Sequence, residues 1–176
     1  MLEYRRTRRI VIIIKYEKTK EINIVTNYSQ TLEKMIQEGK YTGYILPYME
    51  DEGFLPYSRR VAGSNEPEQM AAVLFQFFNG LTACKDIVKV MSKEGYVPAN
   101  LAELLAYGRI YPNEQHEKTI VALGSISQTT GQVASLKTVY GSKEEIKWID
   151  LNPIWDNPFK RGFDEFWSFL AVRKKE

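Results

Sequence analysis

The chain has 176 residues, of which 44% are hydrophobic and 26% are charged, and its formal net charge is +2. These values are typical of a soluble globular protein, and the length suits a single domain, residues 1–176, with a full hydrophobic core. One cysteine, Cys84, excludes an internal disulfide, and one histidine, His116, excludes a site built from several histidines. No apolar run approaches the roughly 20 residues that a membrane-spanning helix needs.

Residues 1–17 place basic side chains before an apolar run, which is the order found in secretory signals. The apolar run covers only residues 10–14, whereas a secretory core needs about 7–15 residues. We therefore predict a buried strand at residues 9–16 and no signal peptide. The basic residues before and at its start are Arg5, Arg6, Arg8 and Arg9. Such a cluster is usually a solvated flank, so nucleic acid is not the favoured partner.

The next part of the chain predicts a strand and a helix before a long loop. Residues 21–26 alternate, which predicts a strand that forms a hairpin with residues 9–16. Residues 29–39 predict a helix, with Gly39 where a helix C-cap glycine belongs. Glycines and prolines interrupt residues 40–68, so we expect a loop there with at most short strands.

The middle of the chain predicts a strand followed by a helix. Residues 69–78 are apolar and aromatic, and they favour a strand because Asn79 and Gly80 follow them. Residues 83–93 repeat apolar side chains at helical spacing, with Thr82 as the candidate N-cap. Cys84 falls on the apolar face of that helix, so we expect a buried core thiol and not a nucleophile.

A second helix is predicted directly after the first, at residues 101–107. Asn100 and Glu103 have the spacing of a capping box at its start, and Gly108 is expected to end it. The strands expected after it are residues 119–125, 132–140, 146–151 and 166–173. This order predicts an α+β fold with a mixed, mainly antiparallel sheet and two adjacent helices. We expect residues 1–80 to be a lead-in and residues 81–176 to be the core of the domain.

Aromatic residues are concentrated near the end of the chain, between Trp148 and Trp167. This stretch has six aromatic residues in twenty positions, where a chain that is 12% aromatic would supply two or three. Asparagine, proline and glycine residues predict a surface loop between its two strands. Large aromatic side chains on exposed loops are common in binding surfaces. The alternative is that these rings fill the core, as we expect for Trp148 and Phe169 within the strands.

Few residues indicate catalytic chemistry. There is no glycine-rich phosphate loop and no GxSxG motif, and a nucleophile–base pair would require Cys84 with His116. We therefore predict no catalytic residues and no cofactor. The alternative is an enzyme or metal-binding protein that uses the loop carboxylates Asp150, Asp156 and Asp164, which could surround a calcium ion if the loops converge.

Three segments resemble a known fold family: GYVPANLAELLAYGRIYP at residues 95–112, then IVALGS, and finally FLAVRK after the loop with tryptophan. They resemble the C-type-lectin-fold proteins of the formylglycine-generating-enzyme type. Val97 stands where that family usually has arginine, and Asn100 where it usually has threonine. Within the family, the chain is similar to the variable target proteins of diversity-generating retroelements, with Ser168 in place of an arginine before Phe169. The resemblance covers roughly residues 20–38 and 82–174.

This resemblance implies a C-type-lectin-like scaffold in which the N-terminal and C-terminal strands pair, so residues 9–16 would lie beside residues 169–174. It implies a variable region at about residues 132–174 that forms an exposed ligand site. The enzymes of the fold use cysteines that this chain lacks. Its calcium-dependent sugar binders use a Trp-Asn-Asp segment, whose order is changed in Trp155-Asp156-Asn157, so no metal is implied.

Variability through adenine-directed mutagenesis of asparagine codons yields Asn, Ser, Tyr, Phe, Ile and Asp, but not Trp or Lys, so Trp155 and Lys160 would be fixed. The implied ligand-binding residues are Tyr140, Ser142, Asn152, Ile154, Trp155, Asn157, Phe159, Phe163 and Phe166. The implied function is non-catalytic recognition of a macromolecule, with a protein as the favoured partner. Without a signal peptide or a membrane span, we expect a cytoplasmic or virion-associated protein.

Overall fold

The computed structural model describes residues 14–42, 66–78, 84–127, 131–140, 145–153 and 166–174. They form an α+β fold with one mixed sheet, as the element order predicted. The elements are β1 (Tyr16–Lys18), β2 (Ile22–Thr26), α1 (Leu32–Gly39), β3 (Glu68–Phe77), α2 (Cys84–Lys93), β4 (Tyr96–Pro98), α3 (Leu101–Ile110), β5 (Thr119–Ile126), β6 (Gln132–Tyr140), β7 (Glu145–Pro153) and β8 (Trp167–Arg173).

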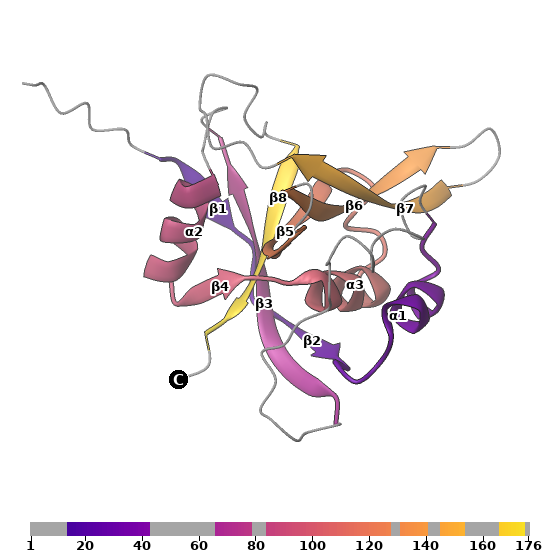
Figure 1. The fold of residues 1–176 in the computed structure, drawn as a ribbon. Helices are drawn as coiled ribbons and strands as arrows, with labels where there is room; N and C mark the ends of the chain where they lie inside the picture. Colours follow the sequence, from indigo (N-terminus) through magenta and orange to yellow (C-terminus); the bar gives the residue numbers. More distant parts are fainter. Residues whose placement is uncertain are drawn as a thin grey trace, which may run out of the picture.

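The sheet has the strand order β1-β3-β8-β5-β6-β7, and Figure 1 shows β3 and β8 side by side at its centre. β2 also pairs with β3, and β4 also pairs with β8. β5 and β8 run parallel, while the other strand pairs are antiparallel. The strands predicted at 69–78, 119–125, 132–140, 146–151 and 166–173 are therefore confirmed, with ends shifted by one or two residues. The short strand β4 was not predicted.

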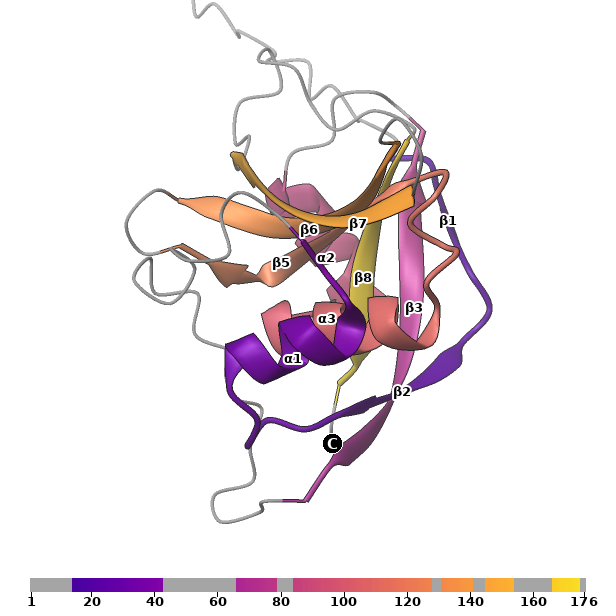
Figure 2. The same cartoon turned by 90° about the vertical axis from the view of Figure 1, so that its right-hand side faces the viewer.

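The two faces of the sheet have separate hydrophobic cores. Helices α1 and α3 cover one face and α2 covers the other, as Figure 2 shows. In β8, Leu170 faces the core under α1 and α3, whereas its neighbour Phe169 faces the core under α2. Because both faces of the central strands are covered, their sequences are almost continuously apolar. None of the described helices is long and apolar enough to cross a bilayer.

Helix α3 begins with the capping box that the sequence predicts. The Asn100 side chain accepts a hydrogen bond from the Glu103 backbone N–H, and the Glu103 carboxylate accepts one from the Asn100 backbone N–H. The sequence predicts that this helix ends at Gly108, and this is wrong, because the helix continues to Ile110. A Cβ atom at Gly108 would lie 2.2 Å from the Tyr41 hydroxyl oxygen, so this glycine is required for close packing and not for ending the helix.

The end of helix α1 also differs from the prediction. Gly39 is the last helical residue, and the left-handed C-cap position is occupied by Lys40 with a φ of 53°. A Cβ atom at Gly39 would lie 2.1 Å from the ring of Tyr41. The glycine therefore makes room for a buried tyrosine, and the unfavourable φ falls on the residue after it.

The predicted hairpin between residues 9–16 and 21–26 is wrong within the described residues, which include residues 14–16 of its first strand. β1 and β2 both pair with β3 and not with each other, with Tyr16 opposite Phe77 and Ile22 opposite Ala72. β3 has ten residues, so one strand offers enough length for two short partners in succession.

The predicted pairing of the end strands is also wrong within the described residues. The first strand, β1, pairs with β3, which lies between it and β8. β8 pairs with β3 on one side, and with β5 and then β4 on the other, so it has no free edge for another strand. Residues 9–13, Thr82 and most of the predicted loop at 40–68 lie outside the described residues.

Candidate functional site

Most of the predicted ligand-binding residues fall where the structure does not describe their side chains. Tyr140 ends β6, and Asn152 lies in β7 opposite Val133, where only the backbone is described. Asn152 is therefore part of a strand and not of the loop, because β7 is longer than predicted. The others outside the described residues are Ser142, Ile154, Trp155, Asn157, Phe159 and Phe163. Phe166 is the one member whose side chain is described.

Of the three carboxylates in the alternative prediction, only Asp150 lies in the described part of the chain, and its side chain is not described. Asp150 lies in β7 opposite Ser135, and Asp156 and Asp164 are outside the described residues. Among the residues that the structure describes, no group of three or more His, Cys, Asp or Glu could hold a metal ion. Cys84 is buried, as predicted. Trp148, like Asp150, has no described side chain.

Phe166 is a large and exposed aromatic side chain immediately before β8. Its side chain is 62% exposed, and its backbone oxygen accepts a hydrogen bond of 2.9 Å from the N–H of Thr119. That bond fixes the start of β8 against the start of β5. Phe78, directly after the end of β3, is 42% exposed. Two exposed phenyl rings thus stand at the same end of the sheet.

A groove lies at this end of the sheet, where β3 and β6 end and β5 and β8 begin. In Figure 1 the upper ends of β3 and β8 mark its position. We call it the strand-end groove and define it by Gln76, Gln115, Lys118, Thr138, Phe166 and Ser168. It consists of adjoining depressions that meet at Lys118, and the one beside Phe166 and Phe78 has a volume of about 340 Å³. That volume is at the lower end of the range for small-molecule sites.

The groove continues the sheet face that carries α1 and α3. Side chains two positions apart in a strand share a face, so each strand shows how the core gives way to the groove. In β3, the residue two positions after buried Leu74 on the same face is Gln76. In β6, the residue two positions after buried Leu136 is Thr138. The same change from apolar to polar occurs from Leu170 to Ser168 in β8 and from Ile120 to Lys118 at the start of β5.

Three polar side chains of the groove have buried polar atoms without hydrogen-bond partners among the described residues. Gln115 and Ser168 are each 1% exposed. In the part of the chain that the structure describes, Nε2 and Oε1 of Gln115, Oγ of Ser168 and Oγ1 of Thr138 have no hydrogen-bond partner. The backbone oxygen of Gln115 accepts from the N–H of Thr138 at 3.0 Å, which holds the connector after α3 against β6.

Such groups are unusual inside proteins. A buried donor or acceptor without a partner costs about 1–3 kcal/mol, and native structures contain few of them. Four of the five such side-chain atoms among the described residues belong to three residues that line one groove, and the fifth is Oγ1 of Thr26 in β2. Their concentration next to an exposed phenyl ring makes this groove the candidate site.

The charges around the groove are mixed. Glu17 and Glu117 line it together with Lys18, Lys118 and Lys137. Both acidic and basic side chains therefore lie around polar but uncharged buried groups. This arrangement favours a ligand that carries little net charge where it meets the floor of the groove.

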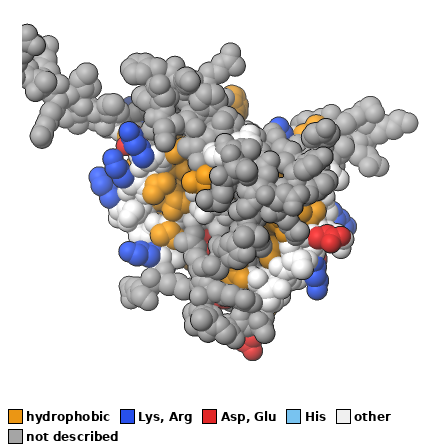
Figure 3. Space-filling model, in the orientation of Figure 1, with side chains coloured by type: hydrophobic (Ala, Val, Ile, Leu, Met, Phe, Trp, Pro, Cys, Tyr) orange, Lys and Arg blue, Asp and Glu red, His pale blue; other side chains and the backbone are white. Residues whose placement is uncertain are grey.

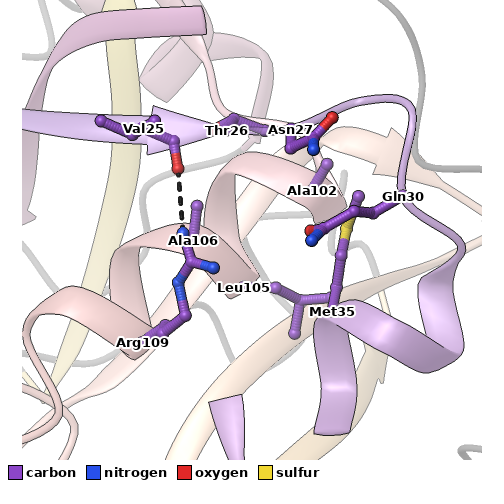
Figure 4. Close-up of a pocket in the computed structure, with 9 residues that line it drawn as sticks. All are labelled: Val25, Thr26, Asn27, Gln30, Met35, Ala102, Leu105, Ala106 and Arg109. Carbon is purple, nitrogen blue, oxygen red and sulfur yellow. Dashed lines mark hydrogen bonds between the residues drawn. The ribbon is translucent and has the colours of Figure 1, made fainter. Parts of the chain in front are cut away.

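A second pocket lies between β2, α1 and α3, and Figure 4 shows its lining residues. Its volume is about 10 Å³, which is enough for one water molecule. Arg109 extends across it and donates hydrogen bonds to the backbone oxygen of Val25 at 3.3 Å and to Glu38 at 2.6 Å. The pocket is too small for a ligand.

Basic side chains gather on the side of the molecule where α2 lies, as Figure 3 shows. Lys85, Lys89 and Lys93 are exposed at intervals of four residues along that helix. Lys89 contacts Asp86 of the same helix at 3.5 Å. Three lysines on a solvated helix face are ordinary, and they give nucleic acid no specific support.

The sequence had indicated Phe166 but not the buried polar residues behind it. Gln115 lies in the polar connector NEQHEK, which looks solvated, yet the structure buries it against β6. Ser168 carried a weak indication, because it is a polar residue within the otherwise apolar strand WSFLAV. Comparisons of this chain with protein-family models, with curated proteins and with solved structures found no significant match.

Proposed function

We propose that this chain is a non-catalytic recognition protein, and that the strand-end groove with the aromatic segment before β8 binds a macromolecular ligand. The observation that carries the proposal is the set of buried polar atoms of Gln115, Thr138 and Ser168 beside the exposed ring of Phe166. Protein-binding surfaces combine aromatic side chains with a small number of fixed hydrogen-bonding groups. A protein is therefore the favoured partner.

The aromatic segment leads along the sequence to Phe166, which lines this groove. Phe166 is the last of the nine proposed ligand-binding residues, and it lines the groove directly. Rings supply large contact areas at a low cost in conformational entropy, and asparagine and serine add adaptable hydrogen bonds. The proposal assigns Phe166 and the residues before it to the rim and Gln115, Thr138 and Ser168 to the floor.

We further propose that the scaffold is C-type-lectin-like and that the chain is the variable target protein of a diversity-generating retroelement. The strand pairing gives partial support when the scaffold is counted from β3. In that unit, the first strand β3 pairs with the last strand β8, and the helices α2 and α3 lie between β3 and β5. The antiparallel strands β5, β6 and β7 follow before the proposed variable segment.

Sequencing the same locus in closely related genomes tests this proposal. We expect substitutions concentrated at the positions that adenine-directed mutagenesis can reach, which are Tyr140, Ser142, Asn152, Ile154, Asn157, Phe159, Phe163 and Phe166. Trp155, Lys160 and the floor residue Gln115 should stay fixed. Invariance at the eight positions, or substitutions spread evenly over the chain, would contradict a variable recognition surface.

A further inference from the structure

The side chain of Gln115 specifies what the floor of the groove can bind. Its amide presents two N–H donors at Nε2 and two acceptor lone pairs at Oε1. Both atoms are buried, and both lack a partner in the described part of the chain. The hydrogen bond of 3.0 Å from the N–H of Thr138 to its backbone oxygen fixes the residue in place. A ligand group that completes this site must therefore supply an acceptor and a donor side by side.

Charged groups do not meet this requirement. A carboxylate offers only acceptors, so it would leave Oε1 of Gln115 without a donor, and an ammonium group would leave Nε2 without an acceptor. A carboxamide offers a donor and an acceptor in one plane, at the same spacing as the amide of Gln115. Two amides can thus form a pair of parallel hydrogen bonds, while the hydroxyls of Thr138 and Ser168 rotate to meet the remaining donors and acceptors.

A vicinal diol, as in a sugar, is the closest competitor. Its two hydroxyl groups could also give one donor and one acceptor to Gln115. Each hydroxyl is a separate rotor that must be fixed on binding, and ordering rotors lowers the affinity. A planar amide is already ordered, so the geometry of the floor favours the amide.

The main-chain groups of the strands under the groove are already paired within the sheet. At this end of the sheet Gln76 of β3 pairs with Ser168 of β8, Thr119 of β5 pairs with Trp167 of β8, and Thr138 of β6 pairs with Lys147 of β7. The strands under the groove are therefore paired with one another, and a ligand cannot add itself as a further strand between them. Recognition must come from side chains.

We infer that the floor of the strand-end groove binds a carboxamide group of a polypeptide, with Gln115 as the pairing residue and Thr138 and Ser168 as its hydroxyl partners. The inference rests on the proposed function and names the ligand chemistry of the same site. The amide belongs to an asparagine or glutamine side chain, because the N–H and C=O of a trans peptide group point in opposite directions and cannot pair with Gln115 side by side. The exposed ring of Phe166 packs on the apolar part of the ligand.

The test is a titration of the ¹⁵N-labelled full chain, followed by NMR, with three small probes. Acetamide represents a side-chain amide, acetate represents an anion and ethylene glycol represents a diol. We expect saturable shifts of the Gln115 side-chain NH₂ signals and of the Thr138 and Ser168 backbone signals with acetamide. The affinity should exceed those for acetate and glycol by about tenfold or more, because a site built for hydrogen bonds rejects groups that leave it unpaired.

Two variants and one internal reference control this titration. Gln115→Leu should abolish the response while the remaining spectrum stays that of the folded protein. Gln37→Leu removes an exposed glutamine on α1 and should leave the response unchanged. In the wild-type protein, the Gln37 side-chain signals report the general effect of the amide as a solvent.

The outcomes separate this inference from the proposed function. An equal or stronger response to glycol would assign the floor to sugars, a stronger response to acetate would assign it to anions, and either result overturns the inference. Shifts no larger than those at Gln37, or a response that survives in Gln115→Leu, also overturn it. If the titration fails while related genomes vary at the rim, the ligand chemistry is wrong and the recognition function stands. If the titration succeeds while the rim is invariant, the amide site stands and the variable display does not.

Discussion

Two buried polar side chains, Glu103 and Gln115, show how differently this fold treats such groups. Glu103 is fully buried, and its carboxylate accepts hydrogen bonds of 2.6 Å from the hydroxyl of Tyr28 and 2.8 Å from the N–H of Asn100. Gln115 is 1% exposed and has no partner for its amide among the described residues. Glu103 holds a helix in place, whereas the amide of Gln115 supports no described part of the fold. This difference supports the proposal that Glu103 serves the fold and Gln115 serves binding.

Two phenylalanines, one in β8 and one directly before it, differ in the same way. Phe169 is 1% exposed, and its ring packs edge-on against Phe77 with centroids 5.8 Å apart, while Phe166 is 62% exposed. We predict that Phe169→Ala lowers the free energy of unfolding by about 3–5 kcal/mol. Phe166→Ala should change it by less than about 0.5 kcal/mol, because the side chain is largely solvated. Urea titrations followed by circular dichroism measure both.

Trp155→Ala extends this comparison to the proposed rim. If Trp155 binds ligand and does not belong to the core, its truncation should resemble that of Phe166 and leave the free energy of unfolding within about 0.5 kcal/mol of the wild type. A loss as large as that of Phe169→Ala would place Trp155 in the core and remove it from the site.

At the scale of elements, local sequence patterns predicted the helix cap and the apolar helix faces correctly. They did not predict which strands pair across long stretches of the chain. The capping box of Asn100 and Glu103 and the apolar faces of α2 and α3 depend on residues within a few positions of one another. The partners of β1 and β2 depend instead on β3, some fifty residues further along the chain. Periodicity identifies a strand but not its partner. The predictions that Gly39 caps one helix and Gly108 ends another were wrong for a related reason. Both glycines make room for Tyr41, and no local sequence pattern indicates that contact.

Helix α3 should depend strongly on Glu103, since this residue closes the capping box and also accepts from Tyr28. Glu103→Ala removes the acceptor and leaves the Tyr28 hydroxyl without its 2.6 Å hydrogen bond to this carboxylate. We predict a loss of about 2–3 kcal/mol in the free energy of unfolding. Glu33→Ala, in the exposed first turn of α1, should cost less than about 0.5 kcal/mol. Equal effects of the two substitutions in denaturant unfolding would contradict the structural role of Glu103.

At the scale of the whole molecule, two carboxylates join the outer strands to the rest of the fold. Glu94, directly after α2, accepts hydrogen bonds from Lys18 at 2.6 Å and Tyr16 at 2.8 Å. Glu21, before β2, accepts from Tyr96 at 2.7 Å and from Arg173 of β8. The hydrogen bonds from Lys18 and then Tyr16 hold the pKa of Glu94 below its ordinary value. Those from Tyr96 and then Arg173 lower the pKa of Glu21 in the same way.

These pKa shifts predict how stability depends on pH. A carboxyl group with a lower pKa in the folded state stabilises the fold above its unfolded pKa, and this contribution is lost as the pH falls through the folded pKa. The free energy of unfolding should therefore decrease between about pH 5 and pH 3. The double variant Glu21→Gln, Glu94→Gln should show a shallower decrease over that window in urea titrations at each pH. An unchanged slope would mean that these two groups do not link β1 and β2 to the fold.

The sequence predicted only part of the candidate site, because most of its residues come from distant parts of the chain. Phe166 was found because aromatic residues in a turn-rich segment are a local pattern. Gln115, Thr138 and Ser168 come from a connector, from β6 and from β8, and only the folded chain brings them to one groove. A polar residue in a polar connector gives no indication that it will be buried. The floor of the site therefore had to come from the structure, while one residue of its rim came from the sequence.

The most direct test of this account is the stability of a chain whose groove floor is made apolar. The variant Gln115→Leu, Thr138→Val, Ser168→Ala replaces the three side chains with apolar ones of similar size and removes the four polar atoms that lack partners among the described residues. If these atoms serve a ligand and not the fold, urea unfolding should show a gain of about 1–3 kcal/mol in the free energy of unfolding, because buried groups without partners no longer oppose folding. An unchanged or lower value would show that the three side chains support the fold, and it would contradict the assignment of the groove as a binding site.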